Sequence, residues 1–170
     1  MSIKCEVRKY IVSLAVVGAA MAALATVVVI ATAGSGAMGT IMARAAFTDA
    51  VDIKIKLRDE REVIHVPHAQ DTVMQQIVIA PGGHTGWHSH PGPAIALVKS
   101  GELTLYSSDD PTCTGRPFGL GQAFVDSGQG HAHIARNLTN QPTEVWVTYL
   151  DVPPGGSVRI DAVNPGNCTF

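Results

Sequence analysis

Residues 82–93 read GGHTGWHSHPGP, and they precede an apolar run at residues 94–98. At the centre of this stretch are His88 and His90. The glycines and prolines on both sides disfavour a helix and favour an extended chain. In an extended chain, residues two apart project to the same side, roughly 7 Å apart, so two imidazoles can converge on one cation. The spacing therefore predicts a strand that carries two neighbouring metal ligands.

A second pair of histidines, His131 and His133, lies in the glycine-rich segment 128–137. Five of the seven histidines of the chain thus lie in two short segments. Neutral imidazole is the commonest metal ligand in proteins, so this pairing favours a metal site over isolated surface or core histidines. The other two, His65 and His68, lie outside both segments, and we expect no function for them.

The spacing of the glycines, histidines and one asparagine resembles the two sequence motifs of the cupin superfamily. The first motif is matched by Gly82, His88, His90 and Gly101, and the second by Gly121, Gly130, His133 and Asn137. This resemblance implies an all-β fold, the cupin jelly roll (double-stranded β-helix), as a small single domain. It also implies that His88, His90 and His133 bind a divalent transition metal, with iron, manganese, zinc, copper and nickel all open. Cupins host many reactions, so the resemblance names none.

Two positions depart from the family pattern. Ala94 stands where the family has its usual glutamate ligand, and Gly128 stands near the place of a proline in the second motif. Three neutral imidazoles would leave the full charge of a divalent ion uncompensated and keep coordination positions open. We therefore expect a small anionic compound, such as a carboxylate, as the ligand of the metal.

Other side chains near the motifs are weaker candidates. His131 has the same strand parity as His133, so we expect it to line the same cavity, as a fourth metal ligand or as an outer group. His84 shares the parity of the first pair, but the glycines beside it can bend the strand. For Trp87 and Asn137 we expect packing and the capping of a turn. Three residues are catalytic candidates by position alone, and a structural role is expected for each: Tyr106, Tyr149 and Asp126.

The composition restricts the class of protein. The chain has 170 residues, a net charge of −2 and 15% charged residues. This length suits one domain plus a tail. No basic run follows the first ten positions, so we expect no nucleic-acid partner. Whether the chain forms a homodimer stays open.

Residues 1–33 have the pattern of a targeting segment. Lys4, Arg8 and Lys9 precede 23 uncharged residues at positions 11–33. This order predicts a hydrophobic helix that is either a cleaved signal peptide or a membrane anchor. The protein is then exported, and it is secreted or anchored facing outward, with membrane contact only through this segment. A buried helix of a soluble protein is the alternative.

We expect a linker rich in small residues at 34–46 and the cupin domain at 47–170. Within the domain, short apolar segments with turn signals about every ten residues predict a sandwich or barrel of strands. The expected strands cover residues 51–57, 63–66, 72–80, 94–98, 103–106, 119–125, 144–150 and 157–162, with a further strand that begins at the second histidine pair.

Cys113 and Cys168 are the two cysteines that follow the targeting segment. An even pair in an exported domain predicts a disulfide. It would close a loop of about 55 residues, which in the chain-entropy model stabilises the fold by on the order of 4 kcal/mol.

Two functions follow as hypotheses. The first is an exported metal-binding cupin that acts as a metal-dependent dioxygenase or other oxidoreductase on a small anionic compound. The second is a non-catalytic cupin that binds a small ligand or a metal at the cell envelope. The sequence shows no clear general base, so it leaves open whether the protein is an enzyme.

Overall fold

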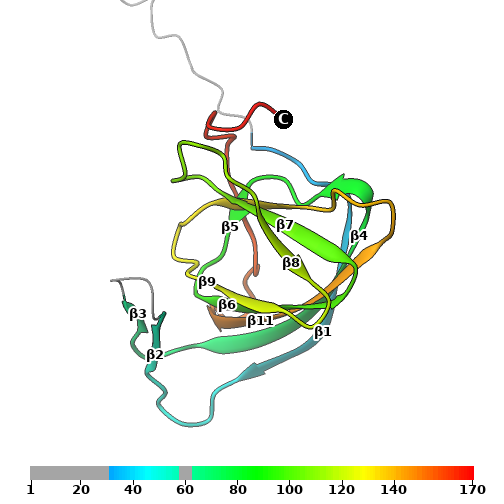
Figure 1. Cartoon of the computed structure of the whole chain (residues 1–170). Coiled ribbons are helices and arrows are strands. Elements are labelled where there is room, and N and C mark those ends of the chain that lie inside the picture. Colours follow the sequence, from blue (N-terminus) through cyan, green and yellow to red (C-terminus); the bar gives the residue numbers. More distant parts are fainter. Residues whose placement is uncertain (1–30, 58–62) are drawn as a thin grey trace, which may run out of the picture.

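The computed structural model describes residues 31–57 and 63–170, in which every regular element is a β-strand (Figure 1). The strands are β1 (Ser35–Ala46), β2 (Ile53–Lys56), β3 (Val63–Val66), β4 (Asp71–His84), β5 (His88–Ser89), β6 (Ala94–Ser100), β7 (Glu102–Ser107), β8 (Arg116–Gly119), β9 (Ala123–Asp126), β10 (His133–Arg136), β11 (Thr143–Val152) and β12 (Ile160–Asp161). In these residues no helix has the length and apolar character needed to cross a membrane. Nearly all of the predicted targeting helix lies outside the described residues.

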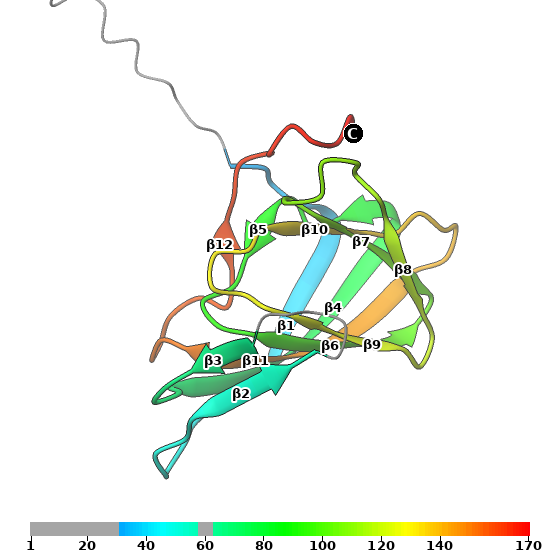
Figure 2. The same ribbon diagram turned by 60° about the vertical axis from the view of Figure 1, so that its left-hand side comes forward.

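Ten strands form one sheet that curves into a nearly closed barrel (Figure 2). The strand order is β12-β5-β10-β4-β11-β6-β9, with β1 added beside β4, and β7 joining β10 to β8. The strands β2 and β3 form a separate hairpin at one end of the barrel. This all-β arrangement is consistent with the predicted jelly roll.

The interior of the barrel follows from the alternation of side chains along its strands. In β11, Val145, Val147 and Tyr149 are buried, whereas Trp146 and Thr148 between them are only partly buried. This confirms the period of two predicted for residues 144–150. Apolar side chains from five strands, and one from the segment that precedes β12, fill the core: Val73, Ile79, Ala94, Ala96, Val98, Leu103, Leu105, Ala135, Val145, Val147, Tyr149, Val152 and Val158.

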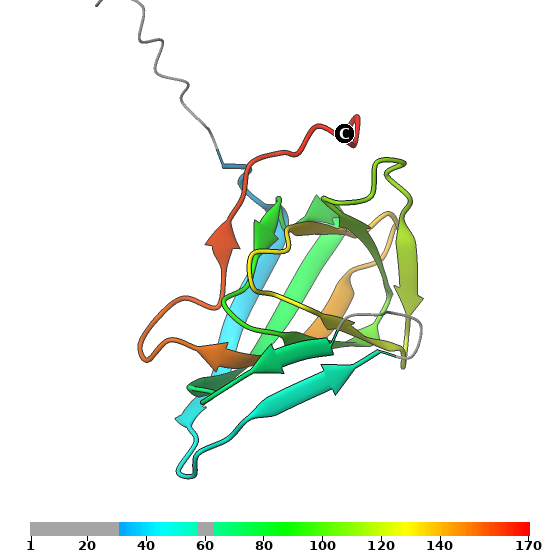
Figure 3. The same cartoon turned by 90° about the vertical axis from the view of Figure 1, so that its left-hand side faces the viewer.

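The predicted linker at 34–46 is instead the long strand β1. It pairs antiparallel with β4, from Ser35 opposite His84 to Ala46 opposite Asp71 (Figure 3). Nearly all its side chains are exposed, so backbone hydrogen bonds to β4 hold it in place. A strand with no buried face shows no apolar alternation, which is why its sequence resembles a linker.

The disulfide between Cys113 and Cys168 is confirmed, with the two Cα atoms 5.3 Å apart. Cys168 packs in a second, smaller apolar cluster with Trp87 and Ile134. The disulfide therefore fastens the C-terminal segment to the loop before β8, beside the strands that carry the histidines.

Candidate metal centre

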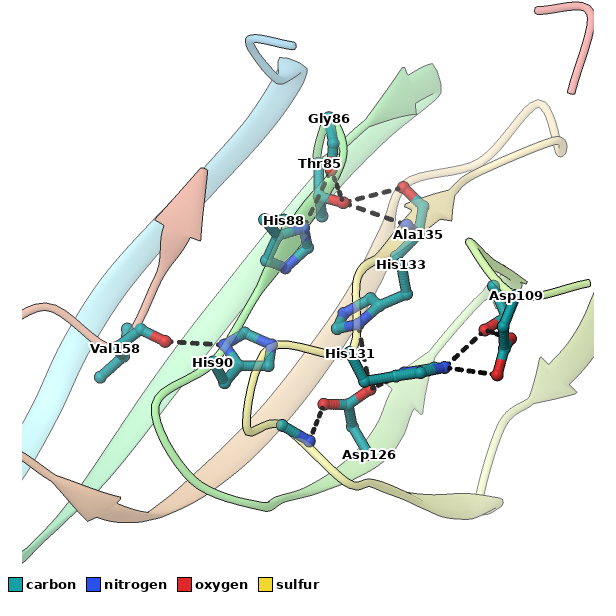
Figure 4. Close-up of polar contacts among 12 residues, drawn as sticks. Thr85, Gly86, His88, His90, Asp109, Asp126, His131, His133, Ala135 and Val158 are labelled. Atoms are coloured by element: carbon teal, nitrogen blue, oxygen red, sulfur yellow. Dashed lines mark hydrogen bonds and ion pairs between the residues drawn. The ribbon is translucent and has the colours of Figure 1, made fainter. Parts of the chain in front are cut away.

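Three histidines from the two motifs meet inside the barrel (Figure 4). His88 lies in β5, His90 follows that strand, and His133 begins β10, where it pairs with His88 across the antiparallel strands. The ring centroids are 4.4 Å apart for His88 and His133, 4.9 Å for His88 and His90, and 5.1 Å for His90 and His133. All three side chains are buried. One ligand nitrogen from each lies within 4.8 Å of the others, which suits a shared divalent ion.

Each imidazole is oriented through its Nδ1 atom. Nδ1 of His88 lies 2.9 Å from the carbonyl oxygen of Gly86, and Nδ1 of His90 lies 2.7 Å from that of Val158. A carbonyl only accepts, so both rings carry their proton on Nδ1 and leave the lone pair of Nε2 free. Histidines that bind metals commonly donate their other ring nitrogen in this way.

The surroundings of His88 and His90 favour the neutral imidazole. Burial is the largest cause that lowers the pKa of His88 to about 2 and that of His90 to about 4. At neutral pH both rings are therefore uncharged and carry a single proton, on Nδ1. A neutral ring is the form that binds a metal.

Two adjoining cavities meet at these histidines. The inner one, of about 40 Å³, has an apolar wall that includes Ala94, the position of the family's glutamate. The outer cavity, of about 390 Å³, is also lined by His88 and His90, and its wall includes Tyr149 and Arg159. The site thus has room for an ion on one side and for a small compound on the other.

Asp126, at the end of β9, is a buried carboxylate beside the histidines. Its Oδ2 lies 3.0 Å from Nδ1 of His133, a short contact that is off the ideal hydrogen-bond direction, and its Oδ1 accepts the N–H of Gly128 at 2.8 Å. Burial raises the pKa of Asp126, but the interactions with His131 and His133 outweigh it and hold this pKa far below its usual value. Asp126 is therefore ionised.

His131 lies outside the inner cavity, contrary to our expectation. It precedes β10, after a turn in which Gln129 and Gly130 have positive φ of 54° and 92°, so the strand parity does not extend to it. Its Nε2 lies 2.8 Å from Oγ of Ser107 and 3.2 Å from Oδ2 of Asp109. The interactions with Asp126 and Asp109 raise the pKa of His131 to about 9, so it is a cation at neutral pH.

A second group of potential ligands consists of Asp126, His131 and His133. Nδ1 of His131 is buried and lies 3.9 Å from Oδ2 of Asp126, and all three residues line another cavity, of about 360 Å³. Nε2 of His131 already contacts Ser107 and Asp109, and Asp126 is shared between two histidines, so this group has fewer free donor atoms. The three-histidine group is the better donor set.

Most of the other sequence candidates are structural, as expected. Trp87 is 1% exposed and packs in the smaller cluster. Asn137 donates to the carbonyls of Ile79 and Gln141 and accepts from Thr139, so it caps a turn. His84 lies in neither of the two cavities at the histidines, and its Nδ1 accepts the N–H of Gly86.

Of the three catalytic candidates, Tyr106 packs against Phe170, away from the histidines. The ring of Tyr149 lies 4.8 Å from that of His90, and its hydroxyl donates to Gln75 at 2.8 Å. Burial raises the pKa of Tyr149 above its ordinary value, so it is a poor general base.

The fold and these residues define a β-barrel with a candidate metal centre, and part of this barrel matches a known family of domains. Residues 75–153 match the family model of the cupin domain, so this part of the chain is a cupin domain. None of the curated proteins matches it.

Several solved structures resemble parts of the chain. A cupin domain from Bordetella pertussis Tohama I is 16% identical, with 68% of this chain and 93% of that chain covered and a TM-score of 0.45. The polyketide cyclase RemF from Streptomyces resistomycificus is 22% identical, with 49% and 56% covered and a TM-score of 0.43. An oxalate oxidase is 27% identical, with 47% and 41% covered and a TM-score of 0.41. The chain thus spans only about half the length of RemF, and these similarities do not indicate a shared activity.

Proposed function

We propose that this protein is an exported cupin that holds a divalent transition metal at His88, His90 and His133 and binds a small anionic compound there. The observation that carries the proposal is the meeting of three buried imidazoles, of which His88 and His90 present a free Nε2. Such a donor set suits iron, zinc, copper, nickel or manganese. A bound ion would supply Lewis acidity to an oxygen of the ligand.

Export has two supports in the chain. The charged and then apolar order of residues 1–33 is typical of a targeting segment. The disulfide between Cys113 and Cys168 is a bond that persists in oxidising compartments and is rare in the cytosol.

Arg159 supports an anionic ligand. It lines the outer cavity together with His88 and His90, and its Nε donates to Asp161 at 2.5 Å. A guanidinium has five N–H donors, so others remain for a carboxylate in the cavity. The two partners of such an anion would then be the metal and Arg159.

Two activities fit this site. In the first, the protein is a metal-dependent dioxygenase or another oxidoreductase acting on the small anion. In the second, it binds the anion or the metal without catalysis at the cell envelope. The engaged hydroxyl and raised pKa of Tyr149 favour the second, because they leave this neighbour of the histidines without a base function.

The test begins with metal analysis and titration calorimetry of protein purified without a histidine tag. We expect one divalent ion per chain in wild type and no stoichiometric binding in His88→Ala or His90→Ala. His65→Ala is the matched control, because His65 is exposed on β3, and it should bind as wild type does. Wild-type binding by His88→Ala would refute the site.

Oxygen uptake then separates the two activities. The metal-loaded protein would be screened against small carboxylates with an oxygen electrode. Uptake that requires His88 indicates an oxidoreductase, whereas calorimetric binding of a carboxylate without uptake indicates a binding protein.

A further inference from the structure

The family's glutamate position faces a carboxylate from another strand. Ala94 in β6 pairs directly with Asp126 in β9. Side chains at paired positions lie on the same face with their Cβ atoms about 4.5–5.5 Å apart. Ala94 and Asp126 accordingly line the same inner cavity as the three histidines. The carboxylate that is absent from one strand is thus present on its neighbour.

The second departure from the family pattern also leads to Asp126. Gly128, near the proline position, donates its N–H to Oδ1 of Asp126 at 2.8 Å. A proline has no N–H to donate, and its ring fixes φ near −65°, whereas Gly128 has φ of +60°. A side chain there would also collide, since an added Cβ would lie 1.9 Å from the carbonyl oxygen of Gly92. Ala94 and Gly128, the two positions that depart from the family pattern, therefore both adjoin Asp126.

Asp126 contacts the side of His133 that faces away from a metal bound at Nε2. Its Oδ2 lies 3.0 Å from Nδ1 of that ring, and Oδ1 is held by Gly128. Asp126 therefore lies behind His133, on the side where the carbonyls of Gly86 and Val158 accept hydrogen bonds from the other two histidines, but its own contact with His133 is an ion-pair contact (Figure 4).

We propose that Asp126 is a positioning residue that supplies, through His133, the negative charge missing at position 94. It keeps the proton of His133 on Nδ1, directs Nε2 toward the metal and makes that nitrogen a stronger donor. A divalent ion then has the same number of carboxylates nearby as in a site with a glutamate ligand, but one more coordination position stays open for an anionic ligand. This inference rests on the proposed metal site.

The decisive variant is Asp126→Asn, which keeps the size of the side chain and removes its charge. Loss of an outer partner of a metal-binding histidine typically weakens metal affinity by about 10–100-fold, and we expect this loss for Zn²⁺ or Mn²⁺ by calorimetry. Asp109→Asn is the matched control, because Asp109 contacts His131 and not His133, and its affinity should stay within about twofold of wild type.

A double-mutant cycle tests whether the two positions replace one another. Ala94→Glu should restore metal binding in the Asp126→Asn background, because it returns one carboxylate to the cavity. In the wild-type background Ala94→Glu should raise metal affinity less, because the new carboxylate would lie beside the like charge of Asp126. If Ala94→Glu changes metal affinity equally in both backgrounds, a carboxylate at position 94 does not replace that of Asp126.

A readout without metal keeps the inference independent of the proposed function. Nitrogen-15 NMR of the histidine side chains should find the His133 proton on Nδ1 in metal-free wild type and shifted toward Nε2 in Asp126→Asn. Circular dichroism would check that the variant is folded. If wild type binds no metal, the proposed function fails, but this proton position still tests Asp126.

Two results would overturn the role of Asp126. One is wild-type metal affinity together with an unchanged His133 proton in Asp126→Asn. The other is a stoichiometry of two ions in wild type and one in Asp126→Asn, which would make Asp126 a direct ligand of a second ion with His131 and His133.

Discussion

Arg159 is the only arginine on the wall of the outer cavity in the described part of the chain. If an anion binds there, Arg159→Gln should weaken the binding of malonate to the metal-loaded protein by about tenfold or more, because a charged hydrogen bond is lost. Metal affinity should not change, since Arg159 lines the cavity and makes no hydrogen bond to the imidazole nitrogens. Calorimetry with Lys99→Gln as a surface control checks this, and equal malonate affinity of all three proteins would contradict it.

His131 should make the metal-free protein sensitive to alkaline pH. Its folded pKa of about 9 lies above the ordinary value of 6.5, so folding favours the protonated ring. The stabilisation is therefore complete below pH 6.5 and is lost as the pH rises through about 9. Urea unfolding in EDTA should show stability falling between pH 7 and 9.5 in wild type.

The control for this pH dependence is His131→Gln, which has no charge to lose. Its stability should be lower than that of wild type at pH 7 and should change less between pH 7 and 9.5. The same slope in both proteins would show that another group causes it.

Among single residues, the local spacing of the motifs predicted which histidines meet: His88, His90 and His133. It did not predict the role of Asp126 or Arg159, because neither belongs to a local pattern. Asp126 reaches the site through the pairing of β6 with β9, and Arg159 through the segment that leads to β12. Such pairings join positions far apart in the sequence, and only the folded register reveals them.

At the scale of elements, the half-buried strand β11 was predictable and the long exposed strand β1 was not. β11 shows its buried face as a period of two, whereas β1 has no such face and resembled a linker. β5 has only two residues and is set by its partners β10 and β12. The prediction that His131 lines the same cavity as His133 was wrong for a similar reason. Side chains two residues apart share a face only within a continuous strand, and His131 precedes β10.

The disulfide joins two elements that are distant in sequence. Replacing both cysteines, in Cys113→Ser/Cys168→Ser, should lower the free energy of unfolding by on the order of 4 kcal/mol, because the unfolded chain regains the entropy of an open 55-residue loop. Urea denaturation with and without a reducing agent measures this. The reductant should destabilise wild type and leave the double variant unchanged; an equal effect on both would contradict the prediction.

For the whole molecule, the main prediction is its location. Cell fractionation should recover the protein outside the cytoplasm, because residues 1–33 combine a basic start with a long apolar run. An intact amino terminus in the membrane fraction would indicate an anchor, and a shortened one in the soluble exported fraction would indicate a signal peptide. Recovery of the full-length protein from the cytosol would contradict export.

The position of Val158 in the chain determines when the metal centre can form. All three histidines have been synthesised once the ribosome passes residue 133, but the carbonyl that orients His90 follows 25 residues later, at Val158. The strand β12, which pairs with β5 beside His88, comes later still. A nascent chain that ends before this segment has the donor atoms without their orientation, so we expect metal loading to be the last step of maturation rather than a template for folding.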